Sequence, residues 1–299
     1  MHVEDIKIPG RTTLAAKLYV PADQGTFPGV LLCHGFASCK EEYMALPHSL
    51  CREGFAVLSF DFSGHGESTG HRGYVSENSH LDDTLRAYQT LVDRPEVDVS
   101  HTALIGHSLG SAAVLRFLGT AAAKLVRCGI VLAPPHQIRQ SVSGFELSTY
   151  TTLATLAKPM LRLTGKHMYI PYRVRPADLY ESSEAIKRAT THKILLPQIS
   201  VHNHRYLMEL QDNVLYAERV QTPMLVIAAE KDKLIPVAQS RKVFEALPNP
   251  DNHWFLLEGS GHSMLGDRKA KEVTAEMVAW LRRHMAEVPP EPVTDQVTA

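Results

Sequence analysis

Short apolar runs, each bounded by Gly, Pro or Asp, recur along the chain and alternate with longer segments of helical pattern. Runs of this length and composition are typical of parallel strands that are buried on both faces of a sheet. Their alternation with helices predicts an α/β fold with helices on both faces of the sheet. The runs span residues 29–33, 55–60, 102–105, 129–133, 224–229 and 253–257.

The stretches between these runs have the length and pattern of helices. At the N-terminus, residues 3–8 and 12–20 alternate on either side of Pro9-Gly10, which predicts an antiparallel hairpin. Together with the buried runs, the hairpin gives a mostly parallel sheet of about eight strands. The expected helices span residues 41–53, 78–92, 109–126, 237–247 and 269–287.

The alternation fails between residues 135 and 221, which lean towards helix and contain no clear buried strand. This segment holds 11 Lys and Arg against 7 Asp and Glu, a local balance of +4, whereas the whole chain has 31 against 32 and a formal charge of −1. We interpret 135–221 as a helical cap inserted into a core formed by 1–134 and 222–287. The Pro-rich tail, 288–299, cannot continue a helix and is expected to be frayed.

Composition excludes several other classes of protein. The near-neutral charge argues against a nucleic-acid partner, which requires an excess of Lys and Arg, and the 44% hydrophobic content is enough for a buried core. No apolar stretch approaches the ~18 residues of a membrane span. Four cysteines in 299 residues do not make a disulfide scaffold. We expect a cytoplasmic protein, with monomer and homodimer both open.

The sequence Gly106-His107-Ser108-Leu109-Gly110 fits the pattern G-x-S-x-G. It lies between an expected strand and an expected helix, so Ser108 would occupy a sharp turn that exposes its hydroxyl. The flanking glycines permit close backbone contacts, and the helix directs its free N–H groups at the site. We interpret Ser108 as a nucleophile, with a serine that merely caps the helix as the alternative.

A serine nucleophile needs a base, and the base needs an acid that orients it. Asp232 directly follows one late apolar run, and His262 follows the next one within a Gly-rich loop. Both therefore lie at the carboxyl ends of strands, in the order Ser, acid, His. We predict a triad of Ser108, Asp232 and His262. The alternative acids are Glu230 and Glu258.

Acyl transfer also needs backbone donors for the oxyanion that develops on the substrate. The loop His34-Gly35-Phe36 follows an expected strand, and the N–H groups of Phe36 and Leu109 are the candidate donors. A structural role is expected for His34, with a catalytic base as the alternative. The segment 61–68 holds a strand-end Asp and two glycines, which favours a fixed turn beside the site.

These motifs stand in a characteristic order: His34-Gly35-Phe36, Asp61 through Ser68, Gly106 through Gly110, Asp232 through Pro236, and Gly261-His262. In this order and spacing they resemble the α/β-hydrolase superfamily, over residues 3–133 and 222–287. Within it, the chain resembles the lysophospholipase, monoacylglycerol lipase and cinnamoyl (feruloyl) esterase group, sometimes grouped with serine aminopeptidases. Ser111 stands where that group often has a second glycine.

The resemblance implies a serine hydrolase that cleaves small-molecule carboxylic esters, such as aryl or cinnamoyl esters or monoacyl lipids. It implies no cofactor and no metal. The same triad would equally serve a thioesterase, an amidase or aminopeptidase, or a hydrolase of carbon–carbon bonds, because the fold does not determine the leaving group. A non-catalytic, ligand-binding relative is the alternative from another class.

Substrate recognition is expected from the cap and from the residues beside the nucleophile. Six of the ten tyrosines lie in residues 135–221. A tyrosine offers an apolar ring with a polar tip, so this enrichment and the local positive balance favour acyl groups with polar or aromatic parts; tyrosines that only pack the cap are the alternative. The candidate substrate-binding residues are His34, Gly35, His107, Tyr150, Tyr169 and Tyr172.

Overall fold

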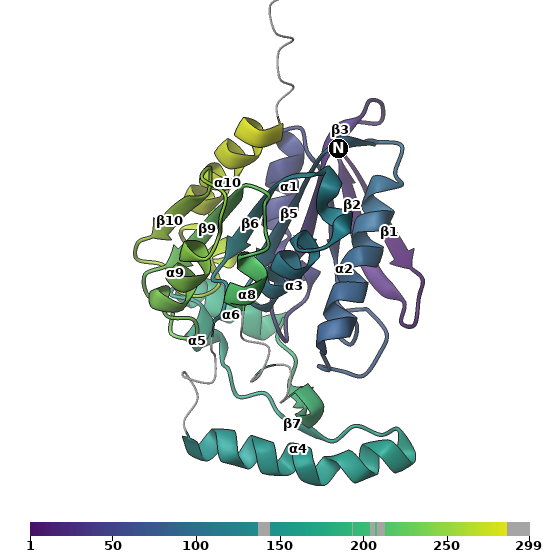
Figure 1. The fold of residues 1–299 in the computed structure, drawn as a ribbon, viewed down its shortest axis with the longest axis vertical. Helices are drawn as coiled ribbons and strands as arrows, with labels where there is room; N and C mark the ends of the chain where they lie inside the picture. Colours follow the sequence, from purple (N-terminus) through teal and green to yellow (C-terminus); the bar gives the residue numbers. More distant parts are fainter. Residues whose placement is uncertain (137–143, 193, 204–206, 208–212, 286–299) are drawn as a thin grey trace, which may run out of the picture.

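The computed structural model describes residues 1–136, 144–192, 194–203, 207 and 213–285, so the expected tail 288–299 lies outside the described residues. At its centre is a sheet with the strand order β1-β2-β4-β3-β5-β6-β9-β10 (Figure 1). Its strands are β1 (His2–Ile8), β2 (Leu14–Val20), β3 (Phe27–Cys33), β4 (Ala56–Phe60), β5 (Val97–His107), β6 (Val126–Leu132), β9 (Met224–Ala229) and β10 (His253–Leu257).

The pairing of these strands confirms the predicted sheet. β1 and β2 form the expected antiparallel hairpin, and β2 also runs antiparallel to β4. All the other pairs of this sheet are parallel. The apolar runs became strands because both their faces are covered: every residue of β4 and of β9 is buried.

Helices cover both faces of the sheet, as the alternation predicted (Figure 1). One face packs against α2 (Glu77–Val92), α3 (Leu109–Leu118), α8 (Asn213–Ala217) and α9 (Val237–Glu245). The other face packs against α1 (Ala45–Arg52) and α10 (Ala270–Met285). Each face thus has its own apolar core, and the carboxyl ends of the parallel strands are left open for loops.

The expected helix over residues 109–126 is wrong in its second half. α3 ends at Leu118, a short 3-10 helix η2 (Ala121–Leu125) follows, and β6 begins at Val126. The amide of Gly119 closes the last turn on the carbonyls of Leu115 and Arg116, while Thr120 is extended and its hydroxyl accepts a bond from the amide of Ala122. This local cap ends the helix inside an Ala-rich stretch whose composition alone favours helix.

The chain between β6 and β9 contributes further helices and a small second sheet. They are α4 (Gly144–Thr164), β7 (Tyr169–Pro171), α5 (Pro176–Leu179), α6 (Ser183–Thr191), β8 (Gln198–Ser200) and the 3-10 helix η4 (Val201–Asn203). α4 lies below the main body (Figure 1), whereas Leu179, Tyr180 and Ala185 belong to a small buried cluster. None of the helices in the described part of the chain has both the length and the apolar character that crossing a bilayer requires.

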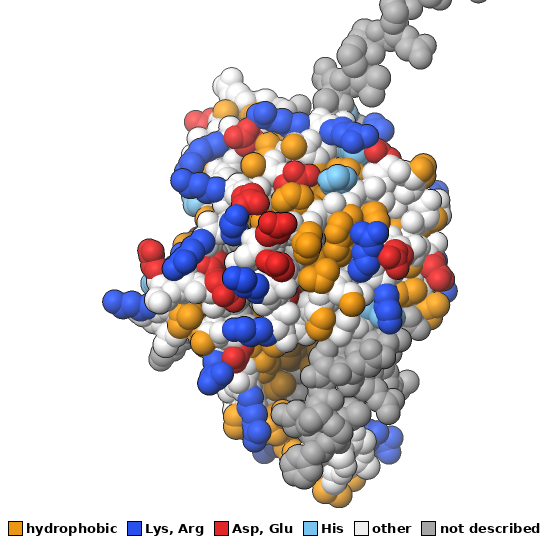
Figure 2. All heavy atoms as spheres, turned by 90° about the vertical axis from the view of Figure 1, so that its left-hand side faces the viewer, with side chains coloured by type: hydrophobic (Ala, Val, Ile, Leu, Met, Phe, Trp, Pro, Cys, Tyr) orange, Lys and Arg blue, Asp and Glu red, His pale blue; other side chains and the backbone are white. Residues whose placement is uncertain are grey.

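The surface beside β10 and α9 carries charges of both signs. Lys and Arg side chains are interspersed with Asp and Glu over this face (Figure 2). Arg241 of α9 pairs with Glu245 one turn later, and Arg283 of α10 pairs with Asp251. Such exposed pairs contribute about 0–1 kcal/mol each, so the stability of the fold rests mainly on the two apolar cores.

The central strand β5 provides a direct test of this core. Leu104 is fully buried in the core beneath α2 and α3, whereas Val99 on the same strand is 42% exposed. We expect Leu104→Ala to lower the free energy of unfolding by about 2–5 kcal/mol, because it leaves a cavity, and Val99→Ala to lower it by less than about 1 kcal/mol. Urea unfolding followed by circular dichroism measures both. Equal losses in the two variants would contradict this description of the core.

Candidate active site

Ser108 lies on a strained turn between β5 and α3. Its backbone angles are φ 53° and ψ −119°, in a region that L-residues rarely adopt. A residue held there costs about 1–3 kcal/mol, so the surroundings must hold it in place. The amide of Ser108 donates to the carbonyl of Leu132 at 2.8 Å, and the amide of Ser111 donates to the carbonyl of Ser108 at 2.9 Å. The turn is therefore fixed from β6 on one side and from α3 on the other.

The two glycines of the G-x-S-x-G pattern are required by space rather than by flexibility. A Cβ atom at Gly110 would stand 2.4 Å from the carbonyl oxygen of Cys33, and one at Gly106 would stand 2.5 Å from the carbonyl oxygen of Gly110. These neighbours are backbone atoms, which cannot move aside as a flexible side chain can. Only glycine lets α3 begin this close to β3, which holds Ser108 against the loop that follows β3.

Ser111 has a role that the sequence did not indicate. Its hydroxyl lies 2.9 Å from the carbonyl oxygen of Gly106 and 3.0 Å from that of Leu132, both on the strands beneath the turn. The departure from the second glycine of the related group therefore adds a buried polar anchor between α3 and the sheet. A hydrogen bond of this kind contributes about 0.5–1.5 kcal/mol.

Asp232 and His262 form a buried acid–imidazole pair. Oδ2 of Asp232 accepts a hydrogen bond from Nδ1 of His262 at 2.7 Å, while its Oδ1 accepts the amides of Leu234 and Ile235, each at 2.8 Å. Asp232 is thus the acid bonded to His262, whereas the alternative Glu230 accepts a bond from the amide of Gly259.

Charge and hydrogen bonding stabilise the ionic forms of this pair. Burial alone would raise the pKa of Asp232, but the neighbouring His262 and the donated hydrogen bonds outweigh burial and hold that pKa below its usual value. Burial alone would lower the pKa of His262, but the carboxylate of Asp232 raises it above its usual value. The arrangement therefore stabilises the imidazolium form of His262.

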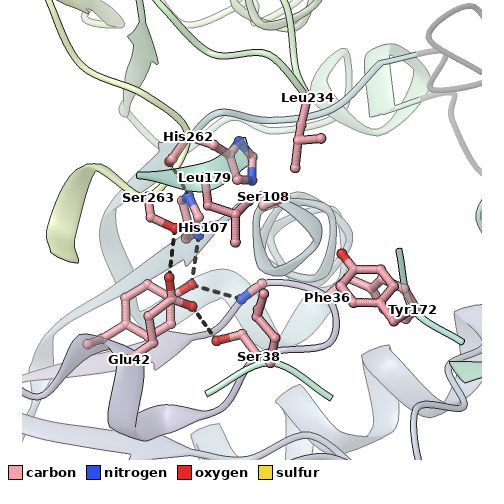
Figure 3. Close-up of a pocket in the computed structure, with 13 residues that line it drawn as sticks. Phe36, Ser38, Glu42, His107, Ser108, Tyr172, Leu179, Leu234, His262 and Ser263 are labelled. Atoms are coloured by element: carbon pink, nitrogen blue, oxygen red, sulfur yellow. Dashed lines mark hydrogen bonds between the residues drawn. The ribbon is translucent and has the colours of Figure 1, made fainter. Parts of the chain in front are cut away.

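A small pocket brings Ser108 and His262 together (Figure 3). Its cavity volume is about 50 Å³, enough for a few water molecules or a short acyl group. One wall comes from the chain between β6 and β9, and another comes from the loop after β3. The lining residues are Gly35, Phe36, Ser38, Glu42, Tyr43, His107, Ser108, Tyr172, Leu179, Leu195, Leu234, His262 and Ser263.

The loop after β3 passes directly beside the turn that holds Ser108. A Cβ atom at Gly35 would stand 3.4 Å from Cβ of Ser108, which shows how closely the two backbones approach. Phe36 lines the pocket, and its ring meets that of Tyr172 edge to face with 5.7 Å between the ring centres. Leu109 is the first residue of α3, where the first amides of a helix have no partner within the helix. The two predicted oxyanion donors therefore lie on the two segments that meet at Ser108.

His107 and Tyr43 link this loop to the loop of His262. The amide of Gly35 donates to the Tyr43 oxygen at 3.2 Å, the Tyr43 oxygen lies 2.7 Å from Nδ1 of His107, and Nε2 of His107 lies 2.9 Å from the carbonyl oxygen of His262. A carbonyl only accepts, so Nε2 carries the proton and Nδ1 accepts the tyrosine O–H. Burial, aided by the charge of His262, lowers the pKa of His107 to about 4, which keeps the ring neutral near pH 7.

The structure places some of the other candidate substrate residues in the pocket lining and others outside it. Gly35, His107 and Tyr172 line the pocket. His34 lies outside this lining; it is buried, and its Nε2 accepts the amide of Phe62 at 2.9 Å. Tyr150 on α4 and Tyr169 on β7 also lie outside the lining, while Tyr206 is not among the described residues.

Two further pocket residues, Glu42 and Tyr43, were missed by the sequence analysis. Both fall within residues 41–53, which were expected to form one helix, but they belong to a separate 3-10 helix, η1 (Lys40–Tyr43), and are buried. The nearby segment 61–68 forms the predicted fixed turn: Asp61 is fully buried and accepts bonds from the Lys40 amide at 2.7 Å and the Lys40 ammonium at 2.8 Å.

Within the described part of the chain, one group of possible metal ligands comes together: Cys39, Glu41 and Asp61, with ligand atoms within 4.8 Å of one another. The ammonium of Lys40 lies 2.8 Å from Asp61 and 3.1 Å from Glu41. A lysine already balances the charge of these carboxylates, so the arrangement is that of an ion-pair network.

Comparison with protein families agrees with this geometry. The model of the family described as serine aminopeptidase, S33, matches residues 28–269, which include Ser108, Asp232 and His262. The chain belongs to this family. It is a member of the α/β-hydrolase superfamily, as its motifs implied.

Relatives of this S33 member include lipases. A monoacylglycerol lipase of Mycolicibacterium smegmatis is 25% identical over 86% of this chain and 88% of its own length. The crystal structure of a monoacylglycerol lipase of Paleococcus ferrophilus superimposes with a TM-score of 0.70, at 24% identity over 95% of this chain and 100% of that one. An uncharacterized abhydrolase domain-containing protein of Dictyostelium discoideum is 22% identical over 95% of this chain, which spans only 29% of that relative.

The close packing at Gly110 can be tested in this S33 chain against a second glycine on the same helix. We expect Gly110→Ala to displace the turn that holds Ser108 and to lower the melting temperature by several degrees, because its Cβ would meet backbone atoms. At Gly119, just past the other end of α3, the nearest atom would be 3.5 Å away, so Gly119→Ala should be tolerated. Thermal unfolding measures both variants. A stable Gly110→Ala protein would show that the helix start is not this tightly packed.

Proposed function

We propose that this hydrolase cleaves carboxylic esters through an acyl-enzyme on Ser108. The observation that carries the proposal is the shared pocket of Ser108 and His262, with Nδ1 of His262 bonded to Asp232 at 2.7 Å. That bond leaves Nε2 as the ring nitrogen available to the serine. The relatives that are named as monoacylglycerol lipases support an ester, rather than another acyl compound, as the substrate.

In the proposed reaction, His262 Nε2 takes the proton of the Ser108 hydroxyl while the serine oxygen attacks the ester carbonyl. Asp232 holds the ring and stabilises the imidazolium that forms. The N–H groups of Phe36 and Leu109 bind the oxyanion of the tetrahedral intermediate. When the carbon–oxygen bond of the ester breaks, His262 returns the proton to the leaving alcohol. Water, activated by the same ring, then hydrolyses the acyl-enzyme.

We also propose that residues 135–221 form a cap that shapes the substrate site. Tyr172, Leu179 and Leu195 come from this segment and line the pocket, which supports the proposal. Its other described tyrosines do not present their hydroxyls to the pocket: the Tyr180 hydroxyl donates to Glu42 at 2.8 Å, the ring of Tyr216 lies against Arg116, and Tyr150 and Tyr169 lie outside the lining. The polar tip available to a substrate is therefore that of Tyr172.

The proposed function predicts the behaviour of two variants. Ser108→Ala should abolish turnover of p-nitrophenyl esters, aryl esters and monoacylglycerols, and should abolish labelling by a fluorophosphonate probe. Asp232→Asn should lower turnover by up to about 10⁴-fold, because the ring loses its orienting acceptor. Initial rates on this panel, with a peptide series added, measure both effects.

Near wild-type ester turnover by Ser108→Ala would overturn the proposal. Cleavage of the peptides alone would replace the ester by an amide as the substrate. Labelling of the wild type without turnover of any compound would show that the acyl group lies outside this panel.

The connection through Tyr43 predicts a smaller and selective effect. Tyr43→Phe removes the O–H that bonds His107 and the acceptor of the Gly35 amide, so we expect kcat to fall about tenfold through loosened oxyanion and His262 loops. Tyr88→Phe is the matched control, because it also removes a buried hydroxyl contact, to Thr102 at 2.9 Å, on the opposite side of the sheet. Turnover by the control should equal that of the wild type. A loss shared by both variants would point to general destabilisation.

A further inference from the structure

A buried carboxylate in the pocket has no part in the reaction as proposed. Glu42 lies on η1, is only 9% exposed, and lines the same pocket as Ser108 and His262. Removing a carboxylate from water costs several kcal/mol unless hydrogen bonds or a cation compensate. A pocket that serves only to bind acyl groups would be better lined by an apolar side chain.

Three hydroxyl groups from three segments converge on Glu42, and Figure 3 shows two of them, those of Ser38 and Ser263. Its Oε1 accepts the hydroxyls of Tyr180 at 2.8 Å and Ser263 at 2.7 Å, and its Oε2 accepts the hydroxyl of Ser38. Burial alone would raise the pKa of Glu42, but in the acidic range where both groups titrate, a proton on His107 and these hydroxyl donors outweigh burial and hold the pKa below its usual value. The site is built to keep this side chain ionised.

Among the titratable groups around Glu42, only one can carry a positive charge opposite its carboxylate. The pocket lining contributes Tyr43, His107, Tyr172 and His262, and Tyr180 comes from the segment before α6. Burial raises the pKa of each of these tyrosines, so they are neutral near pH 7. His107 is neutral as well, since its pKa is lowered to about 4. Burial also lowers the pKa of His34 and raises the pKa of the Cys39 thiol, so these two groups near Glu42 carry no positive charge near pH 7.

The remaining charges near Glu42 are engaged elsewhere. The ammonium of the preceding Lys40 binds Asp61 at 2.8 Å and Glu67 at 2.7 Å. Arg188, which lies near Tyr180, donates to the carbonyl of Gly266. Asp232 is bonded to His262 itself. The cation that can form opposite Glu42 is therefore the imidazolium of His262.

We propose that Glu42 is a positioning residue and a second carboxylate for His262. It holds the His262 loop through the hydroxyl of Ser263, and its charge stabilises the imidazolium that forms when His262 takes the proton of Ser108. Asp232 acts on the ring directly at Nδ1, whereas Glu42 acts from within the pocket without touching the ring or transferring a proton. The proposal rests on the proposed function, in which His262 is the base.

The network also connects the base to the cap. Tyr180 follows α5 in the segment between β6 and β9, and its hydroxyl shares Oε1 of Glu42 with Ser263. A displacement of Tyr180 would therefore remove one donor from the same oxygen that holds the His262 loop. Through this shared atom, the position of the cap is coupled to the position of the base.

The test compares Glu42→Gln with Glu41→Gln, which neutralises the adjacent, partly exposed carboxylate that pairs with Lys40. In the free enzyme, His262 must be neutral to accept a proton. The value of kcat/KM for a p-nitrophenyl ester therefore falls as the pH drops through the pKa of His262. Without the charge of Glu42 that pKa falls, and the acid limb should move to lower pH by about one unit. The plateau of kcat should fall about tenfold, because the imidazolium is less stabilised. Glu41→Gln should keep both the limb and the plateau of the wild type.

A lower plateau with an unmoved acid limb would overturn the proposal, because it would indicate a structural role alone. A second measurement requires no substrate: the NMR titration of His262 in the resting protein should show the same downward shift in Glu42→Gln. This titration separates the two proposals, because it applies even if no ester is hydrolysed. If His262 titrates identically in wild type and variant, Glu42 has no such role.

A third variant covers the case in which Glu42→Gln does not fold. Ser263→Ala keeps the carboxylate but removes its bond to the His262 loop, so we expect kcat to fall several-fold with KM unchanged. Restoration by Ser263→Thr, which returns a hydroxyl, is expected. Wild-type kcat in Ser263→Ala would contradict the positioning role.

Discussion

The close packing of α3 onto the end of β3 is the constraint on which the rest of the site depends. A side chain at Gly110 would collide with the Cys33 carbonyl, so only glycine permits the helix to start there. That start forces Ser108 into its strained backbone conformation and brings it against the loop of Gly35 and Phe36. The strain is sustained because buried hydrogen bonds to β6 and from Ser111 hold the turn on both sides.

Two sets of buried polar groups surround this turn, one neutral and one ionised. His107 and Tyr43 are neutral and join backbone groups of the two loops that border Ser108. Asp232 bonds His262 directly and Glu42 holds the adjacent Ser263; both carboxylates are supported by hydrogen-bond donors that favour their ionised forms. Hydrogen-bonded neutral groups can be buried at low cost, while the two carboxylates are compatible with burial because hydrogen-bond donors surround each of them and, in the proposed reaction, the imidazolium of His262 adds a nearby positive charge.

The sheet and the Asp232–His262 pair were predictable from the sequence because their signals are local. The apolar runs became strands, and the acid–imidazole pair formed between the predicted Asp232 and His262. The end of the helix after Leu118 was not predictable from pattern, because the turn at Gly119 and the extended Thr120, which caps the next 3-10 helix, interrupt an Ala-rich stretch. Glu42 was missed for a different reason: a Glu followed by a Tyr in a helical pattern is typical of a surface helix, and nothing nearby in sequence marks it as buried.

What the sequence by itself determined was the succession of strands and helices along the chain and the placing of Ser108, Asp232 and His262, the residues of the proposed triad, directly after strands. What only the tertiary structure decided was which polar side chains meet around them. Ser263 and Tyr180 reach Glu42 from 221 and 138 residues away, and His107 reaches the carbonyl of His262 across 155 residues. The physical reason is that periodicity and turn chemistry act over a few residues, whereas a buried hydrogen-bond network exists only after distant strand ends have been brought to the same edge of the sheet.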